Sequence, residues 1–287
     1  FDAPVRSALP WAVYPRTVLR RLVANFGSAV HGADIALASN LPPAAGVSSS
    51  SALTVGLTLA FSALSELAAL PAWRTTITDR AALAGYIGAL ENGADFGLLA
   101  GERGVGTLGG AQDQTAILCS EPERLELFRW APVMYERSVP WPSEYAFVIG
   151  VSGVVAAKTG AAKERYNRAA RTAHRLVDAW NLHGGARAHT PARTLREAFE
   201  AASHGPVTQM PSMLVDAARA GADHEFTANH LIARLEQFFD ETFVIVPHAA
   251  DALASGDVPQ FGSLVDRSQG GAERALENQV AETVHLA

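Results

Sequence analysis

The sequence predicts an α+β protein with two lobes, and three observations support this fold class. Short segments with strand-like apolar patterns are concentrated before about residue 152, and long helical patterns follow. A serine-rich loop precedes the longest apolar helix of the first half, and a glycine-rich connection of about 15 residues ends that helical region. The chain of 287 residues is long enough for two modest domains. We therefore expect one lobe over residues 1–145 and a second over residues 146–287.

The elements expected in the first lobe follow from the spacing of apolar residues and from turn signals. They are a helix over 16–24, a strand over 33–38, a loop over 40–51, a helix from Ser50 or Ser51 to about residue 70, a helix over 75–92, a glycine-rich connection over 96–112, and a β-hairpin formed by 115–119 and 124–129. A connection as long as 96–112 inside a compact domain is usually functional or disordered.

The second half is expected to be mostly helical. Its elements are an apolar strand over 145–152, helices over 161–182, 194–202, 229–255 and 260–287, and a loop over 181–191. We expect the tryptophans to pack in the core or between the lobes rather than to form a stacking platform, and this expectation covers Trp11, Trp130, Trp141 and Trp180.

Composition excludes several classes of protein. The chain is 48% hydrophobic and 18% charged, which is typical of globular proteins and not of disordered ones. A net charge of −6 argues against a nucleic-acid surface. Cys119 is the only cysteine, so no disulfide framework is possible, and the nine histidines show no metal-ligand spacing. The apolar stretch 52–70 contains Thr, Ser and Glu and lacks basic flanks, which favours a buried helix over a membrane span.

Residues 41–53 read LPPAAGVSSSSAL, and this is the first candidate site. A glycine permits a tight turn, four serines follow, and a helix begins within them. Unpaired N–H groups and the positive end of the helix dipole make such a place suitable for an anion or a phosphate. The alternative is a serine that only caps a structural helix. The loop is neither a Walker A loop nor a nucleophile elbow, because neither consensus is present.

Two acidic positions are further candidates. Asp113, in the sequence GGAQDQ, lies where the glycine-rich connection ends, and an aspartate there can accept a proton from a substrate hydroxyl or be a simple turn residue. Glu91 precedes Asn92 at the end of the second helix, where it is a solvated helix end or, beside a phosphate site, a ligand of Mg²⁺.

Taken together, these motifs resemble the GHMP superfamily of small-molecule kinases, and among them the galactokinases. The serine loop matches the galactokinase pattern Leu-Pro-x-Gly-Gly-Gly-Leu-Ser-Ser-Ser-Ala-Ser-Leu without a gap, with Ala44 and Ala45 in place of two glycines. A Glu-Asn pair precedes Gly-x-x-Asp-Gln, as in the family, but with a longer stretch between them. Residues 161–171 and 256–264 resemble two later segments, so the resemblance covers nearly the whole chain.

The resemblance implies a fold, a reaction and a set of roles. The fold is the two-lobe GHMP kinase fold, with a ribosomal-S5-like α/β lobe followed by a ferredoxin-like α+β lobe. The reaction is transfer of the γ-phosphoryl of ATP, with Mg²⁺, to the anomeric hydroxyl of a monosaccharide, galactose first. Asp113 is implied as the catalytic base and a sugar contact, Tyr166 as a second sugar contact, and Ser50 and Glu91 as Mg²⁺ ligands. ATP and its phosphates are assigned to Pro42, Gly46, Val47, Ser48, Ser49, Ser50, Ser51 and Ala52.

Other expectations follow from what is not seen in the sequence. The family's first motif would lie before Phe1 and its third after Ala287, so we expect an internal fragment with little activity of its own. No signal peptide is visible, and a cytoplasmic enzyme without membrane or nucleic-acid partners is expected. The alternatives are another GHMP kinase acting on a different sugar, mevalonate or homoserine, a non-catalytic relative that senses sugar and ATP, and a serine hydrolase using the serine loop.

Overall fold

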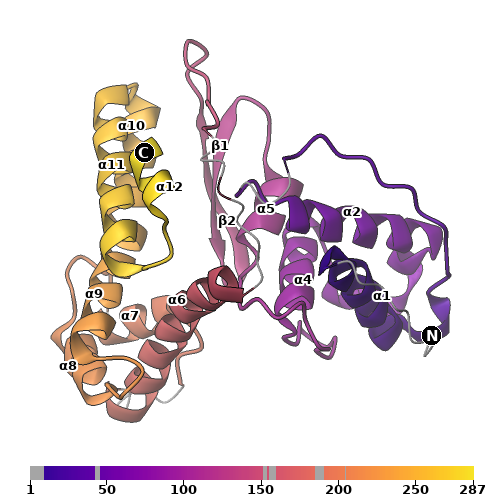
Figure 1. Ribbon diagram of the computed structural model, residues 1–287, viewed down its shortest axis with the longest axis horizontal. Coiled ribbons are helices and arrows are strands. Elements are labelled where there is room, and N and C mark those ends of the chain that lie inside the picture. The colour runs from indigo at the N-terminus through magenta and orange to yellow at the C-terminus, as the bar shows by residue number, and fades with distance from the viewer. Residues whose placement is uncertain (1–9, 43–45, 151–153, 155–159, 185–190, 204) are drawn as a thin grey trace. The chain divides into compact units, whose positions relative to one another are not determined.

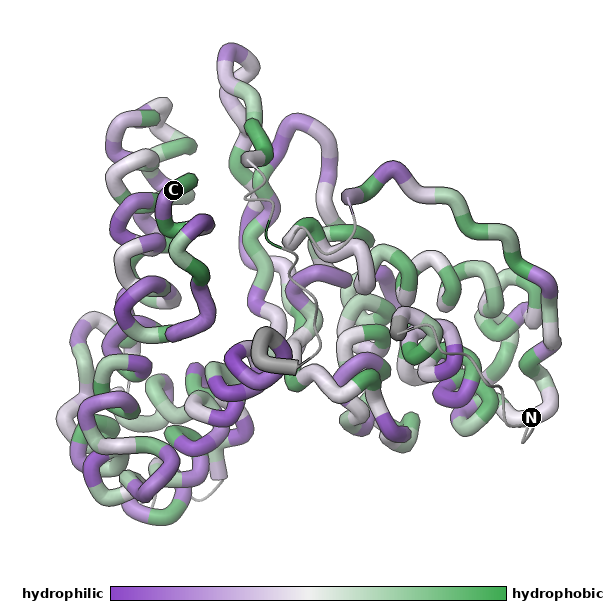
Figure 2. Tube along the Cα trace, viewed as in Figure 1, coloured by the Kyte–Doolittle hydropathy of each residue, from purple (hydrophilic) through white to green (hydrophobic). Residues whose placement is uncertain are grey.

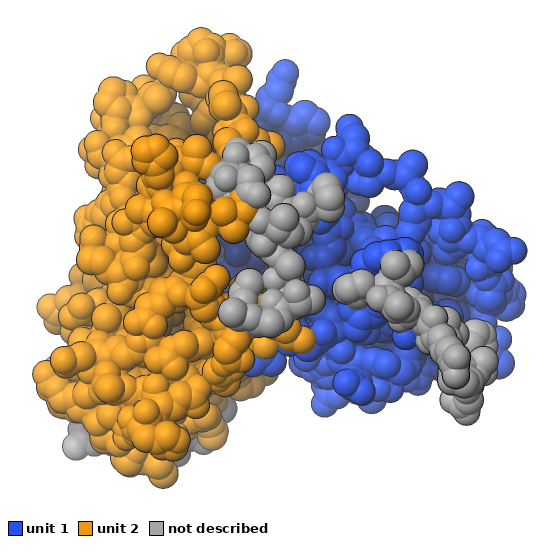
Figure 3. Space-filling model, viewed as in Figure 1, with its two compact units in different colours: residues 1–138, 155–158 blue, residues 139–154, 159–287 orange. Residues whose placement is uncertain are grey.

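The computed structural model describes residues 10–42, 46–150, 154, 160–184, 191–203 and 205–287 (Figure 1). The chain divides into two compact units, coloured separately in Figure 3. Unit 1 comprises Phe1–Ser138 with Val155–Lys158, and unit 2 comprises Val139–Val154 with Thr159–Ala287. Helices dominate both units, and one two-stranded sheet is present in the described part of the chain. The α+β class is confirmed, and the assignment of residues 1–145 and 146–287 to two kinase lobes stays a prediction.

Unit 1 is a cluster of helices followed by a hairpin. Its elements are η1 (Pro10–Ala12), α1 (Val13–Phe26), η2 (Gly27–Ala29), α2 (Ser49–Leu64), η3 (Leu67–Ala69), α3 (Pro71–Thr76), α4 (Arg80–Asn92), α5 (Gln112–Cys119), β1 (Arg124–Trp130) and β2 (Val133–Pro140). The helix α2 is hydrophobic along most of its length (Figure 2) and packs against α1, α4 and α5. The core around these helices includes Leu22, Phe61 and Ile87, all of which are buried.

Aromatic rings close one side of this core. The rings of Phe26 and Trp73 lie 5.5 Å apart, and both contact the ring of Tyr86. Phe96, from the glycine-rich connection, packs edge-on against Tyr86 with ring centroids 6.0 Å apart. Tyr86 is fully buried, and its hydroxyl donates a hydrogen bond to Asn25 Oδ1 at 3.0 Å. The start of the glycine-rich connection is thus anchored in the core.

Unit 2 is built almost entirely of helices. They are α6 (Gly160–Ala179), the π-helical turn η4 (Trp180–Gly184), α7 (Leu195–Ser203), α8 (Ser212–Ala220), α9 (Ala228–Phe239), the π-helical η6 (Asp240–Ile245), α10 (Val246–Ser255), α11 (Val258–Ala275) and α12 (Ala281–Leu286). Phe199 is fully buried in this core, where its ring stacks on Phe238 and Phe239 and lies tilted against Phe243, at centroid distances of 5.3–6.0 Å. The helices predicted over 161–182, 194–202 and 229–255 are confirmed, with π-helical segments inside the first and the third.

Several expected elements are wrong. Residues 33–38 form no strand, since no neighbouring strand within the described residues offers hydrogen bonds to them. Residues 115–119 belong to the helix α5, because Gln114, Thr115 and Leu118 face the core at helical spacing, and the hairpin is formed instead by β1 and β2. Residues 145–150 are exposed and irregular, while 151 and 152 lie outside the described residues.

Other predicted elements have boundaries that differ from the observed ones by a few residues. The helix predicted to reach residue 70 ends at Leu64 and is followed by a 3₁₀ turn, and the helix predicted from residue 75 begins at Arg80, where the Asp79 side chain accepts from the Ala82 N–H at 2.8 Å. The long helix over 260–287 is interrupted after Ala275. Residues 181–184 of the loop expected over 181–191 belong to the π-helical turn η4, and 185–190 lie outside the described residues. Among the described helices none is both long and apolar enough to cross a bilayer.

Candidate functional site

The serine loop forms a tight turn at the N-terminus of α2. Gly46 and Ser48 both have positive φ angles, 79° and 55°, and the φ of Gly46 is one that glycine adopts without strain. Ser48 is the residue before the helix, yet its side chain makes no capping hydrogen bond. A serine that only capped the helix would use its hydroxyl on the first-turn N–H groups. The Ser48 hydroxyl therefore does not occupy those groups, as a site for an anion requires.

The remaining residues of the loop flank this turn. Pro42 and Gly46 are exposed, Val47 and Ser48 to Ser50 are half-buried, and residues 43–45 lie outside the described residues. The first turn of α2 is closed by a hydrogen bond in which the Ala52 N–H donates to the Ser48 carbonyl at 2.9 Å. Ser51 differs from its neighbours because it is buried, with 1% of its surface exposed, and it points to the adjacent helix.

Asp113 lies in the first turn of α5, where the helix dipole favours a carboxylate. The Ser51 hydroxyl donates to Asp113 Oδ2 at 3.3 Å. These residues are 62 positions apart in sequence, so the fold, and not local chain geometry, brings them together. The structure thus joins two of the positions that the sequence singled out.

Glu91 is the third predicted position, and it is held in the same cluster. It lies in the last turn of α4 with 7% of its surface exposed. Its Oε1 accepts hydrogen bonds from Thr54 Oγ1 at 2.6 Å and from Gln114 Nε2 at 2.9 Å. Because an unpaired buried carboxylate is costly, these two donors are what allow Glu91 to remain inside. Glu91 is therefore not the solvated helix end that the sequence left open.

Three residues of this cluster were missed by the sequence analysis. Thr54 follows Ser51 by three positions, the spacing that places two side chains on the same helix face, and Gln114 follows Asp113 directly. Tyr14, on α1, is hydrogen-bonded to Ser50. Burial raises the pKa of Tyr14, the hydrogen bond with Ser50 opposes the rise, and the negative charge of Glu91 adds to it. No sequence pattern marked Tyr14.

The glycine-rich connection is fastened to the end of α4. The side chain of Asn92 donates from Nδ2 to the Gly109 carbonyl and accepts from the Ala94 N–H, each at 2.9 Å. The Val105 N–H donates to the Glu91 carbonyl at 2.9 Å. A Cβ on Gly104 would lie 2.3 Å from that same carbonyl oxygen, so only glycine fits there. These contacts bring the end of the connection back to the end of α4, and Asp113 therefore lies near Glu91.

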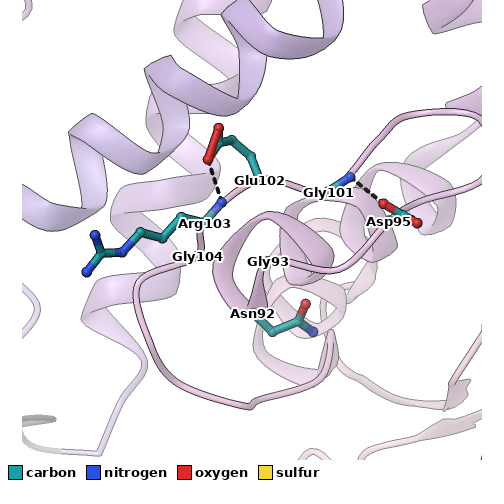
Figure 4. Close-up of a pocket in the computed structure, with 7 residues that line it drawn as sticks. All are labelled: Asn92, Gly93, Asp95, Gly101, Glu102, Arg103 and Gly104. Atoms are coloured by element: carbon teal, nitrogen blue, oxygen red, sulfur yellow. Dashed lines mark hydrogen bonds between the residues drawn. The ribbon is translucent and has the colours of Figure 1, made fainter. Parts of the chain in front are cut away.

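Contacts with α1 also hold the connection in place. Asn25 Nδ2 donates to the Ala100 carbonyl at 3.0 Å, and Arg20 forms an ion pair with Glu102 at 3.3 Å. An open pocket of about 570 Å³ at this turn is lined by Asn92, Gly93, Asp95, Gly101, Glu102, Arg103 and Gly104 (Figure 4). Within it Asp95 accepts a hydrogen bond from the Gly101 N–H. The longer stretch between the Glu-Asn pair and Asp113 is therefore an ordered part of unit 1.

The cluster offers oxygen ligands for a cation. Within the described residues, the hydrogen bonds to Glu91 go to Oε1, which leaves Oε2 for a metal ion, and Gln114 Oε1 is buried without a hydrogen-bond partner. No group of three or more His, Cys, Asp or Glu side chains placed to bind a metal is found in that part of the chain. One carboxylate with hydroxyl and amide oxygens fits Mg²⁺, which is commonly held by one or two carboxylates together with substrate phosphates.

The other predicted residues lie in unit 2. Tyr166 is on α6 with 37% of its surface exposed. Residues 256–264 form the turn before α11 and its first two turns, where Asp257 caps the helix by accepting from the Gln260 N–H at 3.0 Å. The structure thus gives Asp257 a structural role, and the assignment of Tyr166 to a sugar stays a prediction.

Comparison with known proteins finds a family match in the part of unit 1 that contains the candidate site. Residues 13–121 match the family described as GHMP kinases N terminal domain. The matched range begins at α1 and ends just after α5, so it contains the serine loop, Glu91 and Asp113. The predicted resemblance to the GHMP superfamily is confirmed.

A second comparison finds a relative that matches most of the chain. The chain is 26% identical over 267 residues to a galactokinase from Roseiflexus sp. (strain RS-1), a match that covers 93% of this chain and 56% of that protein. The chain thus spans about half the length of the curated relative it matches. The resemblance extends through both units and is close to galactokinase, as the sequence motifs predict.

Proposed function

We propose that the protein is a sugar kinase that transfers the γ-phosphoryl group of ATP to the anomeric hydroxyl of a monosaccharide, with galactose as the first candidate. The observation that carries the proposal is the hydrogen bond from Ser51 to Asp113. It joins a helix N-terminus suited to phosphate to a carboxylate suited to accept a proton. Phosphoryl transfer needs both within reach of one another.

The phosphate side of the reaction is assigned to the start of α2. The N–H groups of the first turn and the helix dipole would offset the negative charge of the ATP phosphates, as would the turn through Gly46 and Ser48. Fixed donors here would bind ATP, and they would accelerate transfer where negative charge on the oxygens that they contact increases in the transition state. Mg²⁺, when bound with ATP, neutralises part of that charge, and Ser50 and Glu91 are the residues that would hold it.

The acceptor side of the reaction is assigned to Asp113. The sugar hydroxyl oxygen forms a bond to the γ-phosphorus, the bond between that phosphorus and the bridging oxygen of ADP breaks, and the hydroxyl proton passes to the Asp113 carboxylate. The Ser51 hydroxyl positions that carboxylate at 3.3 Å. Tyr166 is proposed as a further sugar contact, and we expect the enzyme to work in the cytoplasm, where ATP is abundant.

Two other functions remain to be distinguished by experiment. Another GHMP kinase, acting on a different sugar, mevalonate or homoserine, would use the same cluster with a different acceptor. A sensor of sugar and ATP would bind both without transfer. A serine hydrolase is disfavoured, because Ser51 is buried and is hydrogen-bonded directly to a carboxylate with no histidine between them.

The test is ADP release from ATP and Mg²⁺ in the presence of a panel of acceptors, using protein expressed from the complete gene. The panel contains galactose, glucose, mannose, mevalonate and homoserine. We expect release that depends on a monosaccharide and yields a sugar 1-phosphate. Release that depends on mevalonate or homoserine contradicts the sugar assignment, and ATP binding without release for any acceptor supports the sensor.

A further inference from the structure

Trp130 ends the strand β1, and its side chain lies on the backbone of Gly110. A Cβ on Gly110 would be 2.0 Å from Cζ3 of the indole and 2.4 Å from Cε3. Any side chain larger than hydrogen at position 110 would therefore displace the ring. The two residues come from different elements, since Gly110 closes the glycine-rich connection just before α5 and α5 contacts β1.

Gly110 belongs to the segment that positions Asp113. It precedes Ala111, the residue that caps α5, and lies three positions before Asp113. Ala111 is itself fixed against α4, because a Cβ on Gly88 would lie 2.8 Å from the Ala111 Cα. The indole of Trp130 is thus seated at the N-terminal end of the helix that carries the proposed base.

The indole ring of Trp130 exposes apolar surface that a ligand can contact. Trp130 is 46% exposed although it is anchored to a rigid backbone. Two other exposed aromatic side chains, Tyr135 and Phe147, are each paired with another ring, at centroid distances of 5.6 Å to Phe128 and 4.2 Å to Trp141. Trp130 has no aromatic neighbour among the described residues. Trp130 is therefore not buried in a core, and its expected packing between the lobes stays a prediction.

We propose that Trp130 is the aromatic platform on which the acceptor sugar stacks while its reactive hydroxyl meets Asp113. This inference rests on the proposed function and adds to it a specificity residue. The C–H face of a sugar ring is apolar and fits flat on an indole, whereas the hydroxyl edge is free to reach polar groups. The indole of Trp130 lies beside the start of α5, the helix that carries Asp113. We therefore expect the acceptor sugar, and not the nucleotide, to stack on it.

The test compares the steady-state kinetics of Trp130→Ala and Trp130→Phe, with Tyr135→Ala as the control on the same hairpin. Trp130→Ala is expected to raise the KM for sugar about tenfold, the loss expected for one aromatic contact, and to change the KM for ATP less than about twofold. Trp130→Phe keeps an aromatic face and is expected to recover most of the sugar affinity. Tyr135→Ala is expected to leave both constants unchanged.

A second readout does not depend on turnover. Sugar is expected to quench the intrinsic fluorescence of the protein, which has five tryptophans, and Trp130→Phe is expected to remove most of that response. Sugar affinity that is unchanged in Trp130→Ala overturns the platform and leaves the kinase function standing. A larger effect on ATP than on sugar also overturns it. Trp130-dependent sugar binding without ADP release supports the platform and contradicts the kinase function, and absence of sugar binding contradicts both.

Discussion

The two units use polar side chains in opposite ways. Among the described residues, the buried polar side chains are concentrated in unit 1, and Thr172 is the one such residue in unit 2. Unit 2 surrounds an aromatic core and places several of its charges in surface pairs such as Arg219 with Asp216 and Arg196 with Glu200. Arg234 is an exception, because it lies over the ring of Phe238 and burial lowers its pKa. Surface pairs of this kind contribute little to stability. The aromatic core therefore contributes more to the stability of unit 2 than these ion pairs do.

This difference between the units indicates that the candidate site lies in unit 1. Burying Glu91 and Gln114 carries a desolvation cost that an apolar core would avoid. Their hydrogen bonds connect α2, α4 and α5 at the point where Asp113 meets Ser51. A polar cluster between helices that could have packed with apolar residues is best explained by the chemistry that we propose for it. Each of the following predictions tests one side of this contrast.

The largest effect on stability is expected in the aromatic core of unit 2. Phe199→Ala removes a fully buried ring that packs against Phe238, Phe239 and Phe243, and is expected to lower the free energy of unfolding by about 3–5 kcal/mol. Urea unfolding followed by circular dichroism measures this change. Phe147→Ala, at a ring that is 67% exposed, is the control and is expected to cost less than about 1 kcal/mol. A similar cost for both variants contradicts the placement of the core.

An intermediate effect is expected from Tyr86 in unit 1. Burial raises its pKa to about 12, and the charge of Arg21 opposes the rise. Between about pH 10 and pH 12 the unfolded chain loses this proton while the folded chain keeps it, so the free energy of unfolding falls as pH rises. The loss approaches about 2–3 kcal/mol over that range.

Urea unfolding at pH 9, 10 and 11 tests the role of Tyr86. Tyr86→Phe removes the ionisable group and is expected to flatten the decline, at the cost of about 1 kcal/mol at neutral pH for the lost hydrogen bond to Asn25. Tyr135→Phe, at an exposed position, is expected to keep the decline of the unaltered protein. If the free energy of unfolding of Tyr86→Phe falls with pH as steeply as that of the unaltered protein, the explanation is wrong.

The smallest effect is expected at Ser50. Ser50→Ala removes a proposed Mg²⁺ ligand and the hydrogen bond to Tyr14, and is expected to raise the Mg²⁺ concentration for half-maximal ADP release about threefold to tenfold. Ser263→Ala, which removes a hydroxyl bonded at 3.2 Å to the Pro259 carbonyl on α11, is the matched control. If the Mg²⁺ dependence does not move in Ser50→Ala, Ser50 is not a ligand.

The sequence predicted the parts of the fold that depend on local pattern. Strong helical periodicity placed the helices of unit 2, and the order of the motifs identified Ser51, Glu91 and Asp113 before the structure showed Ser51 bonded to Asp113 and Glu91 buried beside them. The strand over 33–38 failed because a strand requires a partner, which no local pattern supplies. Residues 115–119 are rich in β-branched side chains, and tertiary packing of Gln114 and Thr115 overrode that preference.

Long-range contacts account for what the sequence did not reveal. Tyr14 reaches Ser50 from α1, and Trp130 reaches Gly110 from β1, and neither pairing leaves a spacing signal because the partners are far apart in the chain. A glycine-rich connection as long as 96–112 is usually functional or disordered. Gly104 is instead a point of close packing, where a backbone carbonyl leaves no room for a side chain.

The most direct test of the central claim is the turnover of Asp113→Asn measured together with its affinity for ATP. Asp216→Asn, at an exposed ion pair of unit 2, is the matched control. If Asp113 accepts the proton of the sugar hydroxyl, Asp113→Asn lowers kcat by at least about 100-fold, while ATP affinity stays within about twofold and Asp216→Asn behaves as the unaltered protein. Full turnover in Asp113→Asn contradicts the assignment of the polar cluster as a phosphotransfer site.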